Sequence, residues 1–352
     1  IPFISRYRKE ATGSLDDEQL RKLYERLLYL RNLEEKKEQV LSSIEEQGKL
    51  TEELKEQILA AKTQVQVDDL YRPFRPKRRT RATAAKEKGL EPLAALICLQ
   101  KMKEPVEKAA QQYISEEKGV LTAEEAIAGA KDIIAENISD EPVYRQHIRD
   151  YTVRHGKIVS AAKDKEESSV YEMYYEFEEP IQKLAGHRVL ALNRGEKEKF
   201  LTVKVQAPEE KLLSYLEKHI IVSENSFTAP VLKETIEDSY RRLIAPAVER
   251  EIRNGLTEKA EDGAIGVFGK NLEQLLMQPP ISGQVVLGWD PAFRTGCKLA
   301  VVDATGKVLD TTVIYPTAPT TPQKITAAKE TLKKLIEKYG ITLISLGNGT
   351  AS

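Results

Sequence analysis

A run of cationic side chains between residues 72 and 81 is the densest group in the chain that could bind a ligand. The run contains no acidic residue, and Pro73 and Pro76 favour an extended backbone within it. An extended segment can present successive cations to successive phosphates, and the rings of Tyr71 and Phe74 can stack on bases or fix the segment to a core. The cations are Arg72, Arg75, Lys77, Arg78, Arg79 and Arg81.

The same run allows a second interpretation, because clustered surface charges are often solvated or paired. Asp68 and Asp69 precede the run, and glutamates are frequent in the flanking segments. If the cations pair with these carboxylates, they have little charge left for a ligand. The sequence leaves both interpretations open.

A smaller cationic group surrounds Gly195, where a tight turn could expose backbone amides and cations to a phosphate. Glu196 and Glu198 alternate with these cations, so a charge-balanced turn is the favoured interpretation. The group consists of Arg194, Lys197 and Lys199.

Asp290 is the single residue with the clearest catalytic potential, because it ends an apolar run that is typical of a strand. Hydrolysis with two metal ions needs several carboxylates that converge on ions about 3.5–4 Å apart. Asn348 follows a later predicted strand and offers an amide where a second carboxylate would help, and Asp303 is better explained as a turn residue. We therefore predict no nuclease activity and treat Asp290 as a vestigial candidate.

Arg294 and Lys298 lie close to Asp290 in the sequence. They could hold a phosphate, but an ion pair between Arg294 and Asp290 is the favoured interpretation. Signatures of other enzymes are absent, since no Walker A, GxSxG or GxGxxG motif occurs. The four histidines have no metal-ligand spacing, so we predict no metal and no cofactor.

Composition sets limits on the class of protein. A chain of 352 residues exceeds the size at which one hydrophobic core usually stops growing, which predicts two or more domains. Lys and Arg total 54 against 55 Asp and Glu, so attraction to a polyanion has to come from local clusters of cations. No apolar run approaches a membrane span and no signal peptide is present, which predicts a cytoplasmic protein that does not bind membranes.

The elements that would position these residues are mainly helical. Residues 15–62 show helical spacing of apolar residues, with a break at Gly48 and a new N-cap at Thr51, which predicts a helical hairpin. Further helices are predicted at 89–98, 106–114, 126–137 after a capping box at Thr122, and from Ser139 to residue 151. Between them and a helical region at 208–277, residues 188–192 and 200–206 predict a central β-hairpin that turns at 193–196.

The last part of the chain changes character after Pro279 and Pro280, which predicts a domain boundary. Short runs rich in β-branched residues lie at 285–289, 298–303 and 308–315. An amphipathic helix at 322–339 and an apolar strand at 341–346 follow. The order β-β-β-α-β implies a parallel crossover and therefore an α/β sheet.

Several segments together resemble the Tex family of bacterial transcription accessory proteins, and they occur in order along the whole chain. The last of them resembles the opening of a YqgF, RNase H-like domain, in which Asp290 would stand where nucleases of that fold place their first metal-binding carboxylate. The segments are IPFI at 1–4, RYRKE at 6–10, YRPFRPKRRTRAT at 71–83, EKGLEPL at 87–93, ALNRGE at 191–196, DSYRRLI at 238–244 and GWDPAFRTGCK at 288–298.

The resemblance implies a multidomain protein with a mainly α-helical N-terminal region followed by a partial α/β RNase H-like (YqgF) domain. We expect the helical Tex region, with its β-hairpin, at residues 1–280 and the partial YqgF domain at 281–352. The family would add helix-hairpin-helix elements and an RNA-binding OB-fold downstream, and both are absent here. Because the chain starts without Met and stops just after a predicted strand, we expect it to be a piece of a longer protein.

The function that follows is sequence-nonspecific binding of RNA or DNA through the phosphate backbone, as an accessory to transcription. The cations named above would carry it, with RNA polymerase or another transcription protein as a further candidate partner. A metal-dependent nuclease of the RNase H-like class and a protein-interaction scaffold that docks on the transcription machinery are the alternatives.

Overall fold

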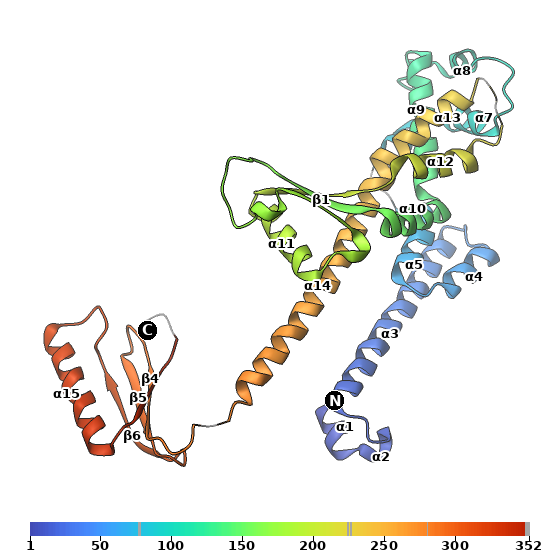
Figure 1. Cartoon of the computed structure of the whole chain (residues 1–352). Coiled ribbons are helices and arrows are strands. Elements are labelled where there is room, and N and C mark those ends of the chain that lie inside the picture. The colour runs from blue at the N-terminus through green and yellow to red at the C-terminus, as the bar shows by residue number, and fades with distance from the viewer. Residues whose placement is uncertain (77–78, 224, 226, 280, 349–352) are drawn as a thin grey trace. The chain divides into compact units, whose positions relative to one another are not determined.

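The computed structural model describes residues 1–76, 79–223, 225, 227–279 and 281–348. Contacts between Cα atoms divide the chain into two compact units, Ile1–Gly266 and Val267–Ser352 (Figure 1). Each unit has its own hydrophobic core. No helix within the described ranges is both long and apolar enough to cross a membrane.

The N-terminal part of the first unit is a set of helices with a small core of its own. The helix α3 starts at a capping box between Asp16 and Gln19, and α4 starts where Thr51 accepts a hydrogen bond from the Leu54 amide. Gly48 adopts a positive φ of 67° between them. The predicted helical hairpin is therefore confirmed. The helices are α1 (Pro2–Tyr7), α2 (Lys9–Thr12), α3 (Asp17–Glu46), α4 (Glu52–Ala60) and α5 (Gln64–Tyr71).

The main core of the first unit is built around α9, which packs against α6, α7, α8 and α13. The predicted helix start at Ser139 is wrong. The Ser139 hydroxyl donates to the Glu136 carbonyl inside α9, and the next helix begins at Pro142. The helices are α6 (Arg81–Glu87), α7 (Glu91–Leu99), α8 (Val106–Ala110), α9 (Ala123–Asp140), α10 (Pro142–His155), α12 (Glu209–Ile220) and α13 (Ala229–Asp238).

A three-stranded antiparallel sheet joins this core, with strand order β2-β1-β3. The strands are β1 (Lys157–Ala162), β2 (Glu176–Pro180) and β3 (Leu201–Gln206). The predicted hairpin at 188–206 is wrong, because residues 188–192 fall inside the helix α11 (Gly186–Lys197) and β3 pairs with β1 instead. A short apolar run does not distinguish a strand from a buried helical segment, and the true partner strand is distant in sequence.

The helical path from α13 into α14 (Ala245–Leu276) is unbroken but changes geometry at residues Ser239–Ile244, which form a π-helix. Pro246 lies two residues after this segment and has no amide hydrogen to donate to the carbonyl four residues earlier. Loss of that hydrogen bond gives a physical reason for the wider turns at this point.

The C-terminal unit contains a four-stranded sheet with order β6-β5-β4-β7, in which β4 and β7 are parallel and the other pairs antiparallel. The helix α15 (Pro322–Tyr339) lies beside the sheet (Figure 1). Its Ala328 and Leu335 are buried in the core that the helix shares with the strands. The predicted β-β-β-α-β order and parallel crossover are confirmed. The strands are β4 (Val286–Asp290), β5 (Cys297–Val302), β6 (Val308–Ile314) and β7 (Leu343–Leu346).

Candidate nucleic-acid interface

The cationic run predicted from the sequence forms the connection between α5 and α6. Its first part, Arg72–Phe74, is a turn of 3-10 helix, so the prediction of a wholly extended segment is wrong there. The backbone becomes extended at Arg75, which has φ −64° and ψ 130°. Lys77 and Arg78 lie outside the described residues.

The two aromatic residues fix the connection to the N-terminal core. The Tyr71 hydroxyl shares a hydrogen bond of 2.9 Å with the Ser43 hydroxyl. The Phe74 carbonyl accepts a hydrogen bond of 2.9 Å from the side-chain amide of Gln47. Both rings pack against the core of α3, α4 and α5. Of the two roles considered for these rings, the structure supports anchoring.

The cations of the connection differ in whether a neighbouring carboxylate neutralises their charge. Arg72 is half-buried and pairs with Asp140 at 3.1 Å. Arg79 is 79% exposed and lies 3.3 Å from Glu87, a geometry that contributes little energy in water. Arg75 and Arg81 are exposed and form no ion pair with any residue that the structure describes.

Of the carboxylates proposed to neutralise the run, the two aspartates pair with other residues. Asp68 pairs with Lys36 at 2.6 Å, and Asp69 pairs with two arginines of α10. Neutralisation by these two residues is therefore wrong, although Arg72 does have an acidic partner in Asp140 and Arg79 in Glu87.

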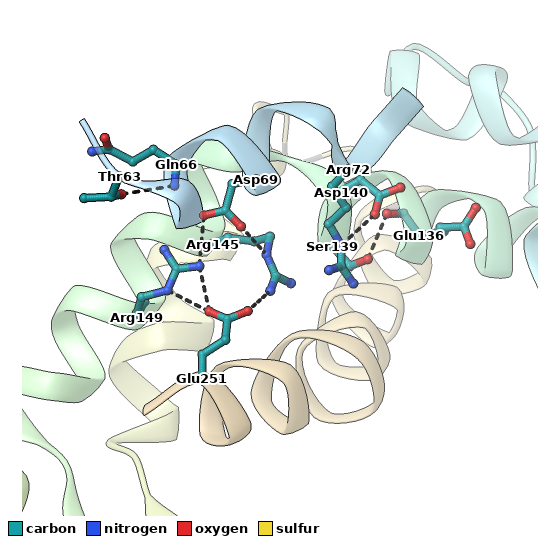
Figure 2. A network of polar contacts seen from close by, with 10 residues as sticks. All are labelled: Thr63, Gln66, Asp69, Arg72, Glu136, Ser139, Asp140, Arg145, Arg149 and Glu251. Carbon is teal, nitrogen blue, oxygen red and sulfur yellow. Dashed lines mark hydrogen bonds and ion pairs between the residues drawn. The ribbon is translucent and has the colours of Figure 1, made fainter. Parts of the chain in front are cut away.

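A buried ion network holds the helix that leads into the connection (Figure 2). Asp69 of α5 lies 3.1 Å from Arg145 and 2.9 Å from Arg149. Both arginines also contact Glu251 of α14, at 2.8 Å and 2.7 Å. The network therefore joins three helices at one point.

Burial and charge act in opposite directions on this network. Burial lowers the pKa of the Arg149 guanidinium, but Asp69 and Glu251 outweigh it through charge and hydrogen bonds and raise that pKa. Arg145 is fully buried, and its Nη1 atom has no partner among the residues described. One weak signal for the network is visible in the sequence, because Arg145 and Arg149 are spaced by one helical turn.

Two surface hollows flank the start of the connection. One has a volume of about 580 Å³, and its lining includes three cations and three carboxylates: Lys49, Arg75, Lys86, Glu136, Asp140 and Glu141. The other, of about 480 Å³, is lined by Arg72 and Arg75 and by carboxylates of the network. Arg75 thus lies between two recesses that could admit a ligand.

The cations around Gly195 belong to the end of α11 and not to a hairpin turn. Arg194 is 75% exposed, and its nearest carboxylate is Glu198 at 3.9 Å. Glu196 is used by Arg253, which forms a short hydrogen bond to it. The Glu196 pKa is lowered, chiefly by that hydrogen bond. Lys197 and Lys199 are exposed.

The predicted catalytic residue lies in the C-terminal unit. Asp290 is exposed at the end of β4, and Lys298 is its register partner on β5. The Gly347 amide donates a hydrogen bond of 2.8 Å to the Trp289 carbonyl. Gly347, which precedes Asn348, therefore lies beside Asp290. The expected ion pair between Arg294 and Asp290 is not found within the described ranges, where Arg294 is exposed. In those ranges no three His, Cys, Asp or Glu residues are grouped to hold a metal.

These features define a class of protein: a helical, ion-paired region that exposes a cationic connection, followed by a small α/β sheet domain. Family models match in the expected order, with a Tex-like N-terminal domain at residues 1–45, a Tex central region at 101–268 and a Tex YqgF-like domain at 284–352. The chain belongs to the Tex family.

Relatives match over the full chain. It is 54% identical to the protein YdcI of Bacillus subtilis (strain 168) and 41% identical to the transcriptional accessory protein Tex of Neisseria gonorrhoeae. It is 32% identical to S1 RNA-binding domain-containing protein 1 of Pongo abelii. All of this chain is covered in each match, against 49%, 46% and 36% of the respective relatives. The chain therefore spans about half the length, or less, of these relatives.

Proposed function

We propose that this chain binds the phosphate backbone of RNA or DNA through the connection between α5 and α6. The observation that carries the proposal is the exposure of Arg75, which directly follows the core-anchored Phe74, and of Arg79. An anchored segment loses less conformational entropy when it binds than a mobile one does. Contacts to phosphates alone would give little preference among sequences.

The relatives support a role in transcription for the whole protein. One is named a transcriptional accessory protein and another an S1 RNA-binding domain-containing protein. We propose that this chain acts in the cytoplasm as an accessory that holds nucleic acid during transcription. Direct contact with RNA polymerase is a further part of the proposal, tested by co-purification after nuclease treatment.

A salt titration tests the proposed contact. For a single-stranded oligonucleotide, the logarithm of the affinity should fall linearly with the logarithm of the salt concentration. Replacing Arg75 and Arg79 together by Ala should make this slope shallower by about 1.4, because each lost phosphate contact accounts for about 0.7. The loss should be similar for oligonucleotides of unrelated sequence. Fluorescence anisotropy at four or more salt concentrations measures both quantities.

The matched control replaces Arg21 and Arg31, exposed residues of α3, by Ala. This variant has the same change in net charge and should keep the original slope. An equal reduction in slope for both double variants would contradict the assignment of the site.

We also propose that the YqgF-like domain does not hydrolyse nucleic acid, because Asp290 is the one carboxylate at the sheet edge where β4 and β7 end, within the described part of the domain. Labelled RNA and DNA incubated with Mg²⁺ or Mn²⁺ should remain intact. Cleavage by this chain that Asp290→Asn abolishes would overturn the proposal.

A further inference from the structure

A third hollow of the first unit lies away from the cationic connection and takes no part in the function proposed above. It has a volume of about 570 Å³, within the range of about 300–1,000 Å³ that is usual for small-molecule sites. Strands β1 and β3, helices α10 and α14 and the π-helical turn contribute to its lining. Ile148, Val205 and Pro246 give it apolar walls.

Two hydroxyl groups in the lining have no hydrogen-bond partner among the described residues, and the first of them is buried. Thr152 is 2% exposed, and its hydroxyl has no partner among the described residues. Tyr240 is 3% exposed, and its hydroxyl forms no hydrogen bond within the same part of the chain. Burial, with a smaller effect of Glu209, raises the pKa of Tyr240 to about 12, so the hydroxyl stays protonated and able to donate. Buried polar groups are rarely left without a partner, which indicates that a ligand can supply one.

The charged residues of the lining are two cations, Lys204 and Arg241, and two carboxylates, Glu209 and Glu249. Glu249 accepts a hydrogen bond of 2.9 Å from the Val205 amide, and Glu209 pairs with Arg241 at 2.7 Å. Arg241 also lies 3.4 Å from Glu237. Because its side chain is 61% exposed, these pairings contribute little energy and it can also contact an anion. Lys204 is exposed and forms no ion pair with the residues described.

We propose that this cavity binds a nucleotide, with the base between the apolar walls and the phosphate at Lys204 and Arg241. A hydroxyl both donates and accepts, so Thr152 and Tyr240 can match the alternating donors and acceptors on the edge of a base. Free mononucleotides and the terminal nucleotide of a strand share this chemistry. The site does not depend on the cationic connection.

Removal of the Thr152 hydroxyl tests the proposal most sharply. In Thr152→Val the affinity for AMP, GMP, CMP or UMP, measured by calorimetric titration of the full chain, should fall by about 2- to 10-fold, the range expected for one hydrogen bond. The melting temperature without nucleotide should stay the same or rise, because the hydroxyl has no partner to lose. A purely structural residue would not combine these two results.

Further variants separate the parts of the cavity. Tyr240→Phe should weaken nucleotide binding in the same way as Thr152→Val. Lys204→Ala should weaken binding of the nucleotide but not of the nucleoside. Ala207→Leu should block the cavity. The matched controls are Thr235→Val, a buried Thr whose hydroxyl donates to the Val231 carbonyl, and Tyr174→Phe, both outside the lining. Both controls should keep the original affinity.

The sources of the ligand are distinguished by competition. A short 5′-phosphorylated oligonucleotide that displaces a bound mononucleotide identifies a strand end as the ligand, and failure to displace it identifies the free nucleotide. The variant Arg75→Ala with Arg79→Ala should leave mononucleotide affinity unchanged, so the two sites fail or succeed separately. Absence of binding by all four nucleotides at millimolar concentration, or equal affinity in Thr152→Val, Tyr240→Phe and Ala207→Leu, would overturn the proposal.

Discussion

Asp69 carries a structural role that its neighbour Asp68 does not share. Asp69 is 7% exposed and contacts Arg145, which is fully buried, and Arg149. Asp68 pairs with Lys36 in a more exposed position. A buried charge that loses its partner costs far more than an exposed one, so two adjacent aspartates should respond very differently to the same substitution.

We expect Asp69→Ala to lower the free energy of unfolding by about 3–5 kcal/mol, because it leaves the buried Arg145 and the partly buried Arg149 undercompensated. The matched change Asp68→Ala should cost no more than about 1 kcal/mol. Denaturant titration followed by circular dichroism measures both. Similar losses for the two variants would show that the network does not stabilise the fold.

The residues of the candidate interface were only partly predictable. The cationic run is visible in the sequence because its members are adjacent. The network is not, since Asp69 and Arg145 are 76 residues apart and only the fold brings them together. For the same reason Thr152 and Tyr240, on different helical segments, gave no signal of a shared cavity.

At the scale of elements, α11 depends on the close approach of a glycine to β3. A Cβ atom at Gly195 would lie 2.6 Å from Cδ1 of the buried Leu201 and 3.2 Å from the Tyr171 ring. Gly255 in α14 has no such neighbour within 4 Å. The two glycines are both helical, and only one of them is required by packing.

Gly195→Ala should therefore lower the free energy of unfolding by about 1–2 kcal/mol, since overpacking outweighs the gain in helix propensity. Gly255→Ala should raise it by about 0.5–1 kcal/mol through that propensity alone. Thermal and denaturant unfolding of the two variants checks the opposite signs. Stabilisation by both would mean that α11 can move away from β3 at little cost.

Elements with local signals were predicted well, and elements defined by distant partners were not. The bounds of α15 agree with the predicted helix at 322–339, because Thr321 caps its start and Gly340, with φ 60°, ends it. The hairpin at 188–206 failed because the partner of β3 is β1, on the other side of β2 and α11 in the sequence. Neither composition nor spacing near Gly195 carries that information.

At the scale of the whole molecule, the two units have separate cores. Leu93 is buried in the large core of the first unit and Leu299 in the small core of the second. Each Leu→Ala change should cost about 2–5 kcal/mol within its own unit. Scanning calorimetry should show two transitions, with Leu93→Ala lowering one melting temperature and Leu299→Ala the other. A single transition shifted by both variants would contradict independent unfolding.

The parallel pairing of β4 with β7 has a consequence for synthesis on the ribosome. β5 and β6 can join β4 soon after they emerge, but β7 follows only after the 18 residues of α15. During that interval the backbone amides and carbonyls along one side of β4 have no strand to bond. Translational pauses before Leu343 would lengthen the period in which nascent chains on neighbouring ribosomes can associate through that side, whereas faster elongation would shorten it.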